Sequence, residues 1–191
     1  MSDIKSIVRC PWSLTSELMI KYHDEEWGVP LRDDRRLFEF ILLDSFQAGL
    51  SFNTILNKRE NFRKAFDNFD PQKIARYSDK RIEKLLNNAG IVRNKLKITG
   101  TINNARKFIE IQKEYGSFDK FIWQFTNDKT IKNSWQSVKK IPSRTAQSDA
   151  MSKALIEKGF KFVGTKICYA FMQAAGMVND HLVGCYRYKS I

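Results

Sequence analysis

The segment ALIEKGFKFVGTKICYAFMQA, residues 154–174, decides the fold that we expect for this chain. Apolar residues recur at helical spacing on both sides of a short turn, which Gly159 and Gly164 bracket. The second helix begins at Thr165, where free N–H groups and the helix dipole form a site for one phosphate. The pattern predicts a hairpin of two helices with an anion-binding turn.

Positively charged side chains surround this turn. They are Lys153, Lys158, Lys161 and Lys166, with Glu157 as the only acid among them. The arrangement resembles a helix-hairpin-helix element, at about residues 148–176, which binds the DNA backbone without reading its sequence. The alternative is an ordinary corner between two helices with a solvated lysine face. The glycines and the lysine density favour DNA contact. The contacting residues would be Gly159, Lys161, Gly164, Thr165 and Lys166.

The rest of the chain repeats the helical periodicity and shows no strand-length alternation, which predicts an all-α fold. The expected helices cover residues 35–46 (capped by Asp34), 54–66, 79–89, 93–115, 118–125, 149–158 and 165–175. The polar segment at residues 126–147 is the least periodic part, and we expect a surface loop there.

Composition limits the class of protein. The chain has 191 residues, which favours one domain spanning residues 1–191. Its net charge of +12 indicates a polyanionic partner, with nucleic acid ahead of an anionic membrane. No apolar run approaches the ~20 residues that span a bilayer, and residues 1–12 lack a secretory apolar stretch. Three cysteines without disulfide-like spacing are typical of a reducing cytoplasm, where we expect this protein. We also expect a monomer without an obligate protein partner.

The two histidines of the chain each accompany a cysteine, at opposite ends of the sequence. Cys10 and His23 lie near the start, and His181 and Cys185 lie near the end. Two thiolates and two imidazoles are a complete tetrahedral set for structural zinc, and one ion would tie both ends together. The alternative is that Cys10 is a lone surface thiol and both histidines are solvated. If a metal takes both imidazoles, catalysis must use carboxylate, tyrosine, lysine or backbone groups.

Three further stretches identify a family. They are YHDEEWGVP at 22–30, QAGLSF at 47–52 and GFKFVGTKICYAFMQAAGMVNDHLVGC at 159–185. Together they closely resemble the DNA-3-methyladenine glycosylase I family of the helix-hairpin-helix glycosylase superfamily, in one register from Arg9 to Cys185. The resemblance implies a monofunctional enzyme that flips N3-methyladenine out of double-stranded DNA and hydrolyses its glycosidic bond, in base excision repair. It also implies that the two Cys–His pairs are the ligands of one structural zinc ion.

The resemblance assigns a base pocket and a wedge. Aromatic side chains that stack on the flipped base would be Trp12, Tyr22, Trp27 and Phe52. The alternative for these rings is plain core packing. Leu50, in the Gly49–Ser51 turn, is similar to the family's apolar wedge, which fills the gap left in the duplex.

The chain departs from the family's usual pattern at two positions in this region. The usual glutamate that bonds the methylated base is Asp44 here, and the usual tryptophan after QAGLS is Phe52. An aspartate reaches roughly 1.5 Å less far, about one C–C bond, so the backbone lies closer to the base or a water bridges the gap. We predict that Asp44 is the catalytic, base-recognising carboxylate.

Two other hypotheses stay open on the sequence. One is a non-catalytic, zinc-stapled helix-hairpin-helix module with a decayed pocket, as Asp44 and Phe52 allow; the aromatic cluster argues against it. The other is a bifunctional glycosylase/lyase, because Lys166 follows the hairpin where such enzymes carry a Schiff-base lysine. Phosphate contact is the simpler explanation of that lysine.

Overall fold

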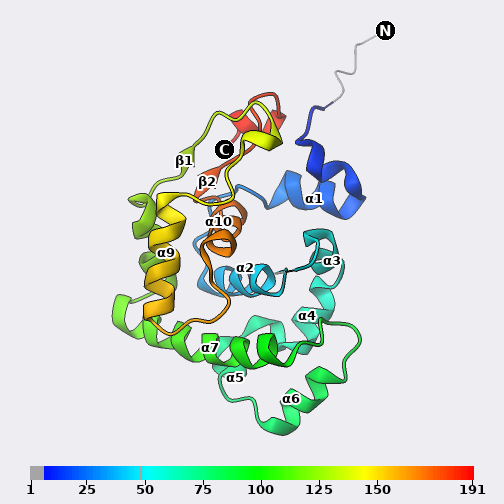
Figure 1. Ribbon diagram of the computed structural model, residues 1–191, viewed down its shortest axis with the longest axis vertical. Coiled ribbons are helices and arrows are strands. Elements are labelled where there is room, and N and C mark those ends of the chain that lie inside the picture. Colours follow the sequence, from blue (N-terminus) through cyan, green and yellow to red (C-terminus); the bar gives the residue numbers. More distant parts are fainter. Residues whose placement is uncertain (1–6, 48) are drawn as a thin grey trace.

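The computed structural model describes residues 7–47 and 49–191 and is mostly helical, as predicted (Figure 1). Its helices are α1 (Glu17–Glu25), α2 (Asp34–Gln47), α3 (Phe52–Asn57), α4 (Arg59–Ala65), α5 (Pro71–Ile74), α6 (Asp79–Leu86), α7 (Lys95–Tyr115), α8 (Phe118–Trp123), α9 (Ala146–Glu157) and α10 (Thr165–Ala174). Short 3-10 helices include η1 (Pro11–Thr15), η4 (Val138–Lys140) and η5 (Tyr186–Lys189). One detail departs from an all-α chain: β1 (Ile131–Lys132) pairs in parallel with β2 (Val178–Asn179). A strand of two residues is too short to show the alternation of apolar and polar residues by which strands are recognised in a sequence.

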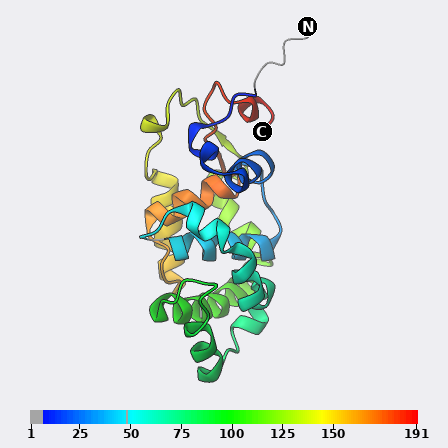
Figure 2. The ribbon, with the colours of Figure 1, turned by 90° about the vertical axis from the view of Figure 1, so that its right-hand side faces the viewer.

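Helix α2 is the central element of the core. Every residue from Leu37 to Phe46 is buried, whereas the sequence suggested a helix with one apolar face. Helix α10 packs on both α2 and α9. Figure 2 shows α10 and α2 stacked across the middle of the molecule, between α1 above and α7 below. A helix surrounded by protein on most sides is apolar around most of its circumference. This explains why the apolar residues of α2 are not confined to one face.

Several expected helix boundaries are wrong: α6 ends at Leu86 instead of residue 89, and α9 begins at Ala146 instead of residue 149. Asp33, rather than Asp34, caps α2, since its Oδ1 accepts a hydrogen bond from the Arg36 backbone N–H at 2.9 Å. The Asp34 carboxylate instead accepts the backbone N–H groups of Phe118 and Asp119 and so caps α8. The helix expected over residues 54–66 divides at Lys58 into α3 and α4.

The segment at residues 126–147 is more than the predicted surface loop. It carries β1 and η4, and the Asn133 and Trp135 side chains donate hydrogen bonds to buried Asp180. These contacts fix its central part over α10, where several of its residues line the pocket described below. A polar, non-periodic sequence carries no signal for such a tertiary placement.

The first described residues and the C-terminal segment lie side by side at one end of the molecule (Figure 1). The Tyr186 backbone N–H donates to the Val8 carbonyl at 3.0 Å. This contact brings the two Cys–His pairs together. Within residues 7–47 and 49–191, no helix is long and apolar enough to cross a bilayer.

Candidate active site and metal centre

A cavity of about 490 Å³, which we call the pocket, opens between α1, α2, α10 and residues 138–143. Its volume is in the range of small-molecule sites. One face of α10 forms a wall, through residues at helical spacing: Lys166, Tyr169, Ala170 and Gln173. The pocket therefore lies directly above the central α2–α10 contact.

All four rings assigned to a base pocket lie on the walls of this one pocket. Trp12 and Trp27 meet edge to face with ring centroids 4.8 Å apart, and Tyr22 and Phe52 lie 4.9 Å apart. Tyr22 and Trp27 also belong to the hydrophobic core, whereas Trp12 and Phe52 are only partly buried against it. The rings thus combine core packing with exposed aromatic faces on which a planar base can stack.

Asp44 projects from α2 into the pocket wall. Its side chain is buried, and its Oδ2 atom has no hydrogen-bond partner among the described residues. Burial raises the pKa of Asp44 from 3.8 to about 8, so the carboxyl of the free protein is mostly protonated at neutral pH. An unpaired buried carboxyl group is costly to a fold, and it is poised to pair with a ligand that donates hydrogen bonds or carries positive charge.

A second, smaller cavity of about 10 Å³ borders Asp44, and Tyr22, Phe52 and Arg59 are among its walls. That volume is close to the space that one water molecule needs. Arg59 also has a buried nitrogen, Nη2, without a partner in the described part of the chain. The short Asp44 side chain therefore leaves a small space beside it.

Sequence reasoning missed several pocket residues. Met19, Gln173 and part of the segment at residues 138–143 line the pocket, and Lys166, which the sequence assigned to DNA contact or to lyase chemistry, lines it as well. The signal for Gln173 was present, because it lies seven positions after Lys166 and thus on the same helix face. Neither Met19 nor the 138–143 segment carries a pattern that sets it apart from core or loop.

The turn between α2 and α3 exposes the candidate wedge. Gly49 has a φ of +84°, a left-handed conformation that glycine adopts readily, and Leu50 is 42% exposed. Gln47 and Phe52, on either side of this turn, both line the pocket. An exposed leucine at the rim of a pocket is unusual for packing and suits insertion into a base stack.

Side-chain hydrogen bonds to backbone carbonyls stabilise the hairpin between α9 and α10. The Asn103 and Asn104 side chains donate to the carbonyls of Gly159 and Lys161, and Ser152 donates to that of Val163. Gly164 is the N-cap of α10 and is exposed, as is Lys161. The N-terminus of α10 is therefore exposed at Gly164, whereas the Thr165 hydroxyl beside it donates a hydrogen bond to the Asp149 carboxylate.

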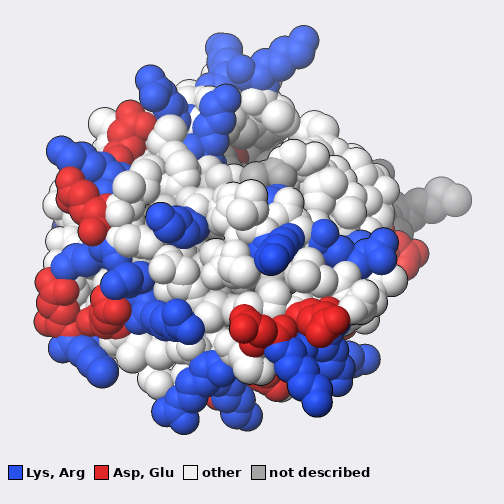
Figure 3. All heavy atoms as spheres, turned by 60° about the horizontal axis from the view of Figure 1, so that its bottom comes forward, with Lys and Arg blue, Asp and Glu red and all other residues white. Residues whose placement is uncertain are grey.

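The lysines around the hairpin are not equivalent. Lys158 lies 2.6 Å from Glu114, so this ammonium group is already neutralised. Lys153, Lys161 and Lys166 are exposed. On the face shown in Figure 3, basic and acidic side chains alternate around the rim, so the excess positive charge does not form one continuous patch there.

The two Cys–His pairs form one buried cluster, as the sequence predicted. The four ligand atoms of Cys10, His23, His181 and Cys185 all lie within 4.8 Å of one another. Cys185 Sγ lies 3.4 Å from His23 Nε2 and 3.6 Å from His181 Nδ1, and Cys10 Sγ lies 3.7 Å from His181 Nδ1. A tetrahedral zinc ion, with bonds of about 2.3 Å to sulfur and about 2.0 Å to nitrogen, holds such atoms roughly 3.5 Å apart. The cluster is thus suitable for a metal ion.

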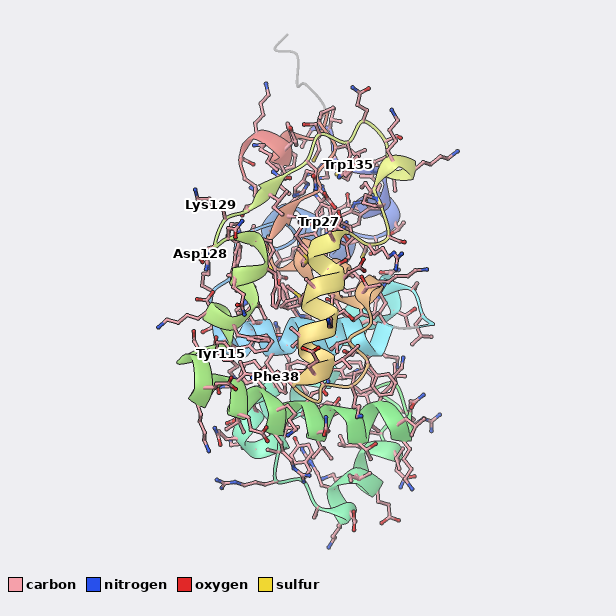
Figure 4. All side chains as sticks on the ribbon, turned by 60° about the vertical axis from the view of Figure 1, so that its left-hand side comes forward. Trp27, Phe38, Tyr115, Asp128, Lys129 and Trp135 are labelled. Carbon is pink, nitrogen blue, oxygen red and sulfur yellow. The ribbon has the colours of Figure 1, made fainter. Side chains whose placement is uncertain are left out.

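The outer nitrogen of each imidazole also has a partner. His23 Nδ1 lies 2.8 Å from Asp24 Oδ1, and Arg9 binds the same carboxylate. His181 Nε2 lies 3.1 Å from the Trp27 carbonyl oxygen. Such contacts orient imidazole ligands toward a metal. The second one also joins the cluster to a wall of the pocket. Figure 4 shows Trp27 in the upper part of the molecule, which contains the chain ends.

Comparison with known proteins gives concordant matches. The family model described as methyladenine glycosylase matches residues 12–188. DNA-3-methyladenine glycosylase 1 of Escherichia coli (strain K12) is 48% identical over 180 residues, 94% of this chain and 96% of its own. DNA-3-methyladenine glycosylase of Haemophilus influenzae is 44% identical over 177 residues, 93% and 96% of the two chains.

Solved structures agree in fold. A crystal structure of a 3-methyladenine DNA glycosylase I superposes with a TM-score of 0.92 at 49% identity, covering 94% of this chain and 98% of that one. The enzyme from Staphylococcus aureus, solved to explain 3-methyladenine recognition, gives a TM-score of 0.90 at 34% identity, with 93% and 95% covered.

Proposed function

This chain belongs to the methyladenine glycosylase family, and we propose that it excises 3-methyladenine from alkylated DNA by flipping the base into the pocket and hydrolysing its glycosidic bond. It is a DNA-3-methyladenine glycosylase, like the curated relatives that it matches along most of their length, and in this proposal it acts in base excision repair. The feature that best supports the site assignment is Asp44, a buried residue that lines the aromatic-walled pocket and has one carboxyl oxygen without a hydrogen-bond partner among the described residues.

The chemistry of the lesion fits such a pocket. In DNA, N3-methyladenine is a cationic base with a weakened glycosidic bond, so its departure needs little protonation by an acid. Binding of the cation favours the ionised form of Asp44, whose pKa is raised by burial in the free protein. A neutral adenine gains less from the same carboxylate, and that difference supports selectivity for the lesion. Water is the nucleophile in this proposal.

The surfaces around the pocket support binding of double-stranded DNA. Leu50 fills the gap left by the flipped nucleotide, next to the pocket rim. The N–H groups at Gly164 and Thr165, with the exposed ammonium of Lys161, bind a phosphate of the backbone near the turn that Gly159 begins. Lys166, at the pocket mouth, adds a positive charge close to the abasic sugar.

Zinc is the ion we propose for the Cys–His cluster. Four protein ligands complete a tetrahedral shell and leave no open position, so the metal has a structural role. Its bound form would fix the hydrogen bond from His181 to the Trp27 carbonyl and thereby steady one pocket wall.

The experiment that tests the function is incubation of the protein with methylated DNA, followed by chromatographic identification of the freed bases. We expect 3-methyladenine as the main released base, with intact abasic sites left in the strand. If no alkylated base is released while duplex DNA is bound, the non-catalytic DNA-binding module replaces the enzyme.

A further inference from the structure

Asp180 forms a buried hydrogen-bonding centre behind the pocket. The residue is 1% exposed and follows β2. Its Oδ1 accepts from Asn133 Nδ2 and Trp135 Nε1, and its Oδ2 accepts from Tyr169 OH, each at 2.7 Å. The fourth partner is Gln173 Nε2, also 2.7 Å from Oδ2. Figure 4 shows Trp135 in the same upper part of the molecule as Trp27.

This arrangement fixes which end of the Gln173 amide faces Asp180. The oxygens of a carboxylate accept hydrogen bonds from N–H and O–H groups, and the indole N–H of Trp135 only donates them. With four partners on two oxygens, the carboxylate requires the NH₂ group, not the carbonyl, of Gln173. The carbonyl oxygen Oε1 is then the amide atom directed away from Asp180. Gln173 lines the pocket, whereas Asp180 does not.

We propose that Gln173 is a second specificity-determining residue of the pocket, because Asp180 locks its amide so that the carbonyl oxygen accepts a hydrogen bond from the flipped base. This inference rests on the proposed function and deepens it. An adenine lesion presents an amino group at C6, which donates, whereas a guanine lesion presents a carbonyl oxygen there, which accepts. Two facing carbonyl oxygens would lose their solvation without gaining a hydrogen bond, so purines with a 6-oxo group are disfavoured.

Asp44 alone does not provide this selection. A carboxyl whose pKa lies near 8 takes up or loses a proton readily around neutral pH, so it can donate to a carbonyl as well as accept from an amine. The Gln173 amide cannot reverse its role while Asp180 holds its NH₂ group. Asp44 therefore responds to the charge of the base, and Gln173 responds to the group at C6.

The test compares two free bases, 3-methyladenine and 3-methylhypoxanthine, which differ in the group at C6 and in the ring proton that the 6-oxo form carries. Their dissociation constants are measured by quenching of tryptophan fluorescence, since Trp12 and Trp27 line the pocket. We expect the parent protein to prefer 3-methyladenine and Gln173→Leu to reduce that preference by about tenfold or more. Asp180→Asn, which permits the amide to turn over, should reduce the preference in the same direction.

Asn133→Ala is the matched control, because it removes a donor from the same carboxylate at Oδ1 and leaves the contact with Gln173 in place. This variant should keep the parent preference. If Asp180→Asn does not fold, Gln173→Leu still decides. An unchanged preference in Gln173→Leu, or a parent without any preference, would overturn the inference. Release of 3-methyladenine from methylated DNA by the parent is measured in parallel, so failure of the inference is distinct from failure of the proposed function.

Discussion

The metal-ligand cluster and the pocket lie next to each other, yet their polar groups are arranged in opposite ways. In the cluster, both imidazoles have an outer partner, Asp24 for His23 and the Trp27 carbonyl for His181. In the pocket, Asp44 is as deeply buried but keeps an oxygen without any described partner. Burying an unpaired polar group costs about 1–3 kcal/mol. The cluster thus has its polar groups paired within the fold, whereas the pocket wall keeps an unpaired carboxyl oxygen where we propose that a ligand binds.

The largest effect is expected on thermal stability, when a ligand of the Cys–His cluster is removed. Loss of a ligand in His181→Ala removes the metal, and structural zinc contributes roughly 10 kcal/mol or more to small zinc domains. For a larger chain that retains its core, we expect the melting temperature to fall by more than about 10 °C in thermal unfolding. Elemental analysis of the parent, purified without chelator, should give one zinc per chain.

The control for this variant is Cys168→Ala. Cys168 is buried and lies outside the cluster, with its thiol bonded to the Val163 carbonyl. It should retain one metal per chain even if it loses some stability. A parent protein without stoichiometric metal, or His181→Ala with the parent melting temperature, would contradict a structural metal site.

The next largest effect concerns the pH dependence of stability, and it comes from the unpaired carboxyl group of Asp44 in the pocket. Burial raises the folded pKa of Asp44 to about 8, above the 3.8 of an unfolded chain. The folded state therefore keeps a proton that the unfolded state releases, and this contribution to stability, complete below about pH 4, is lost progressively up to about pH 8. Between pH 5 and 8, the free energy of unfolding of the parent should fall by roughly 3 kcal/mol because of Asp44, and Asp44→Asn should not show this decrease. Urea unfolding of both proteins at several pH values measures the difference, and parallel profiles would show that Asp44 does not titrate in this window.

How far the sequence predicts these two regions follows from the chemistry of each. The cluster could be predicted because only two histidines exist and each lies near a cysteine, so few ligand sets are possible. The pocket rings needed the family resemblance, because an aromatic residue at helical spacing looks the same in a core and in a pocket. Gln173 and Asp180 are far less visible, since their pairing depends on a turn after α10 that brings β2 back beside it.

The fold shows the same limit. Long helices such as α7 were predicted from periodicity and end markers, with Gly116 at a φ of +85° closing that helix. The Asp34 error arose because two adjacent aspartates can each cap a helix, and which helix each one caps is decided by packing of α8 against α2. Tertiary contacts, not local signals, settle such choices.

A medium effect is expected on excision itself. Asp44→Asn keeps the shape of the side chain but loses the charge, and loss of a charged hydrogen bond costs ~1.5–3 kcal/mol, or about ten- to a hundredfold in rate. We expect 3-methyladenine release to slow by that factor while affinity for undamaged duplex barely changes, because the backbone contacts that we propose lie at the hairpin. Release at the parent rate would remove Asp44 from base recognition. Asp44→Glu should keep activity, since the pocket of about 490 Å³ and the small cavity beside Asp44 leave room for one methylene.

The smallest effect is expected at Lys166, which lines the pocket mouth without belonging to either polar centre. A lysine that attacks a sugar carbon is activated by desolvation in an apolar site, and the Lys166 side chain is exposed. We therefore expect the parent to leave intact abasic sites and to give no covalent enzyme–DNA adduct on treatment with borohydride. Lys166→Ala should yield the same products and bind DNA a few-fold more weakly, with a salt dependence lowered by about one phosphate contact. Lys153→Ala, an exposed lysine of α9 that does not line the pocket, is the control for general charge loss. An adduct that forms with the parent and with Lys153→Ala but disappears in Lys166→Ala would assign lyase chemistry to Lys166. The pocket would then contain a nucleophilic lysine in addition to the Asp44 carboxyl group.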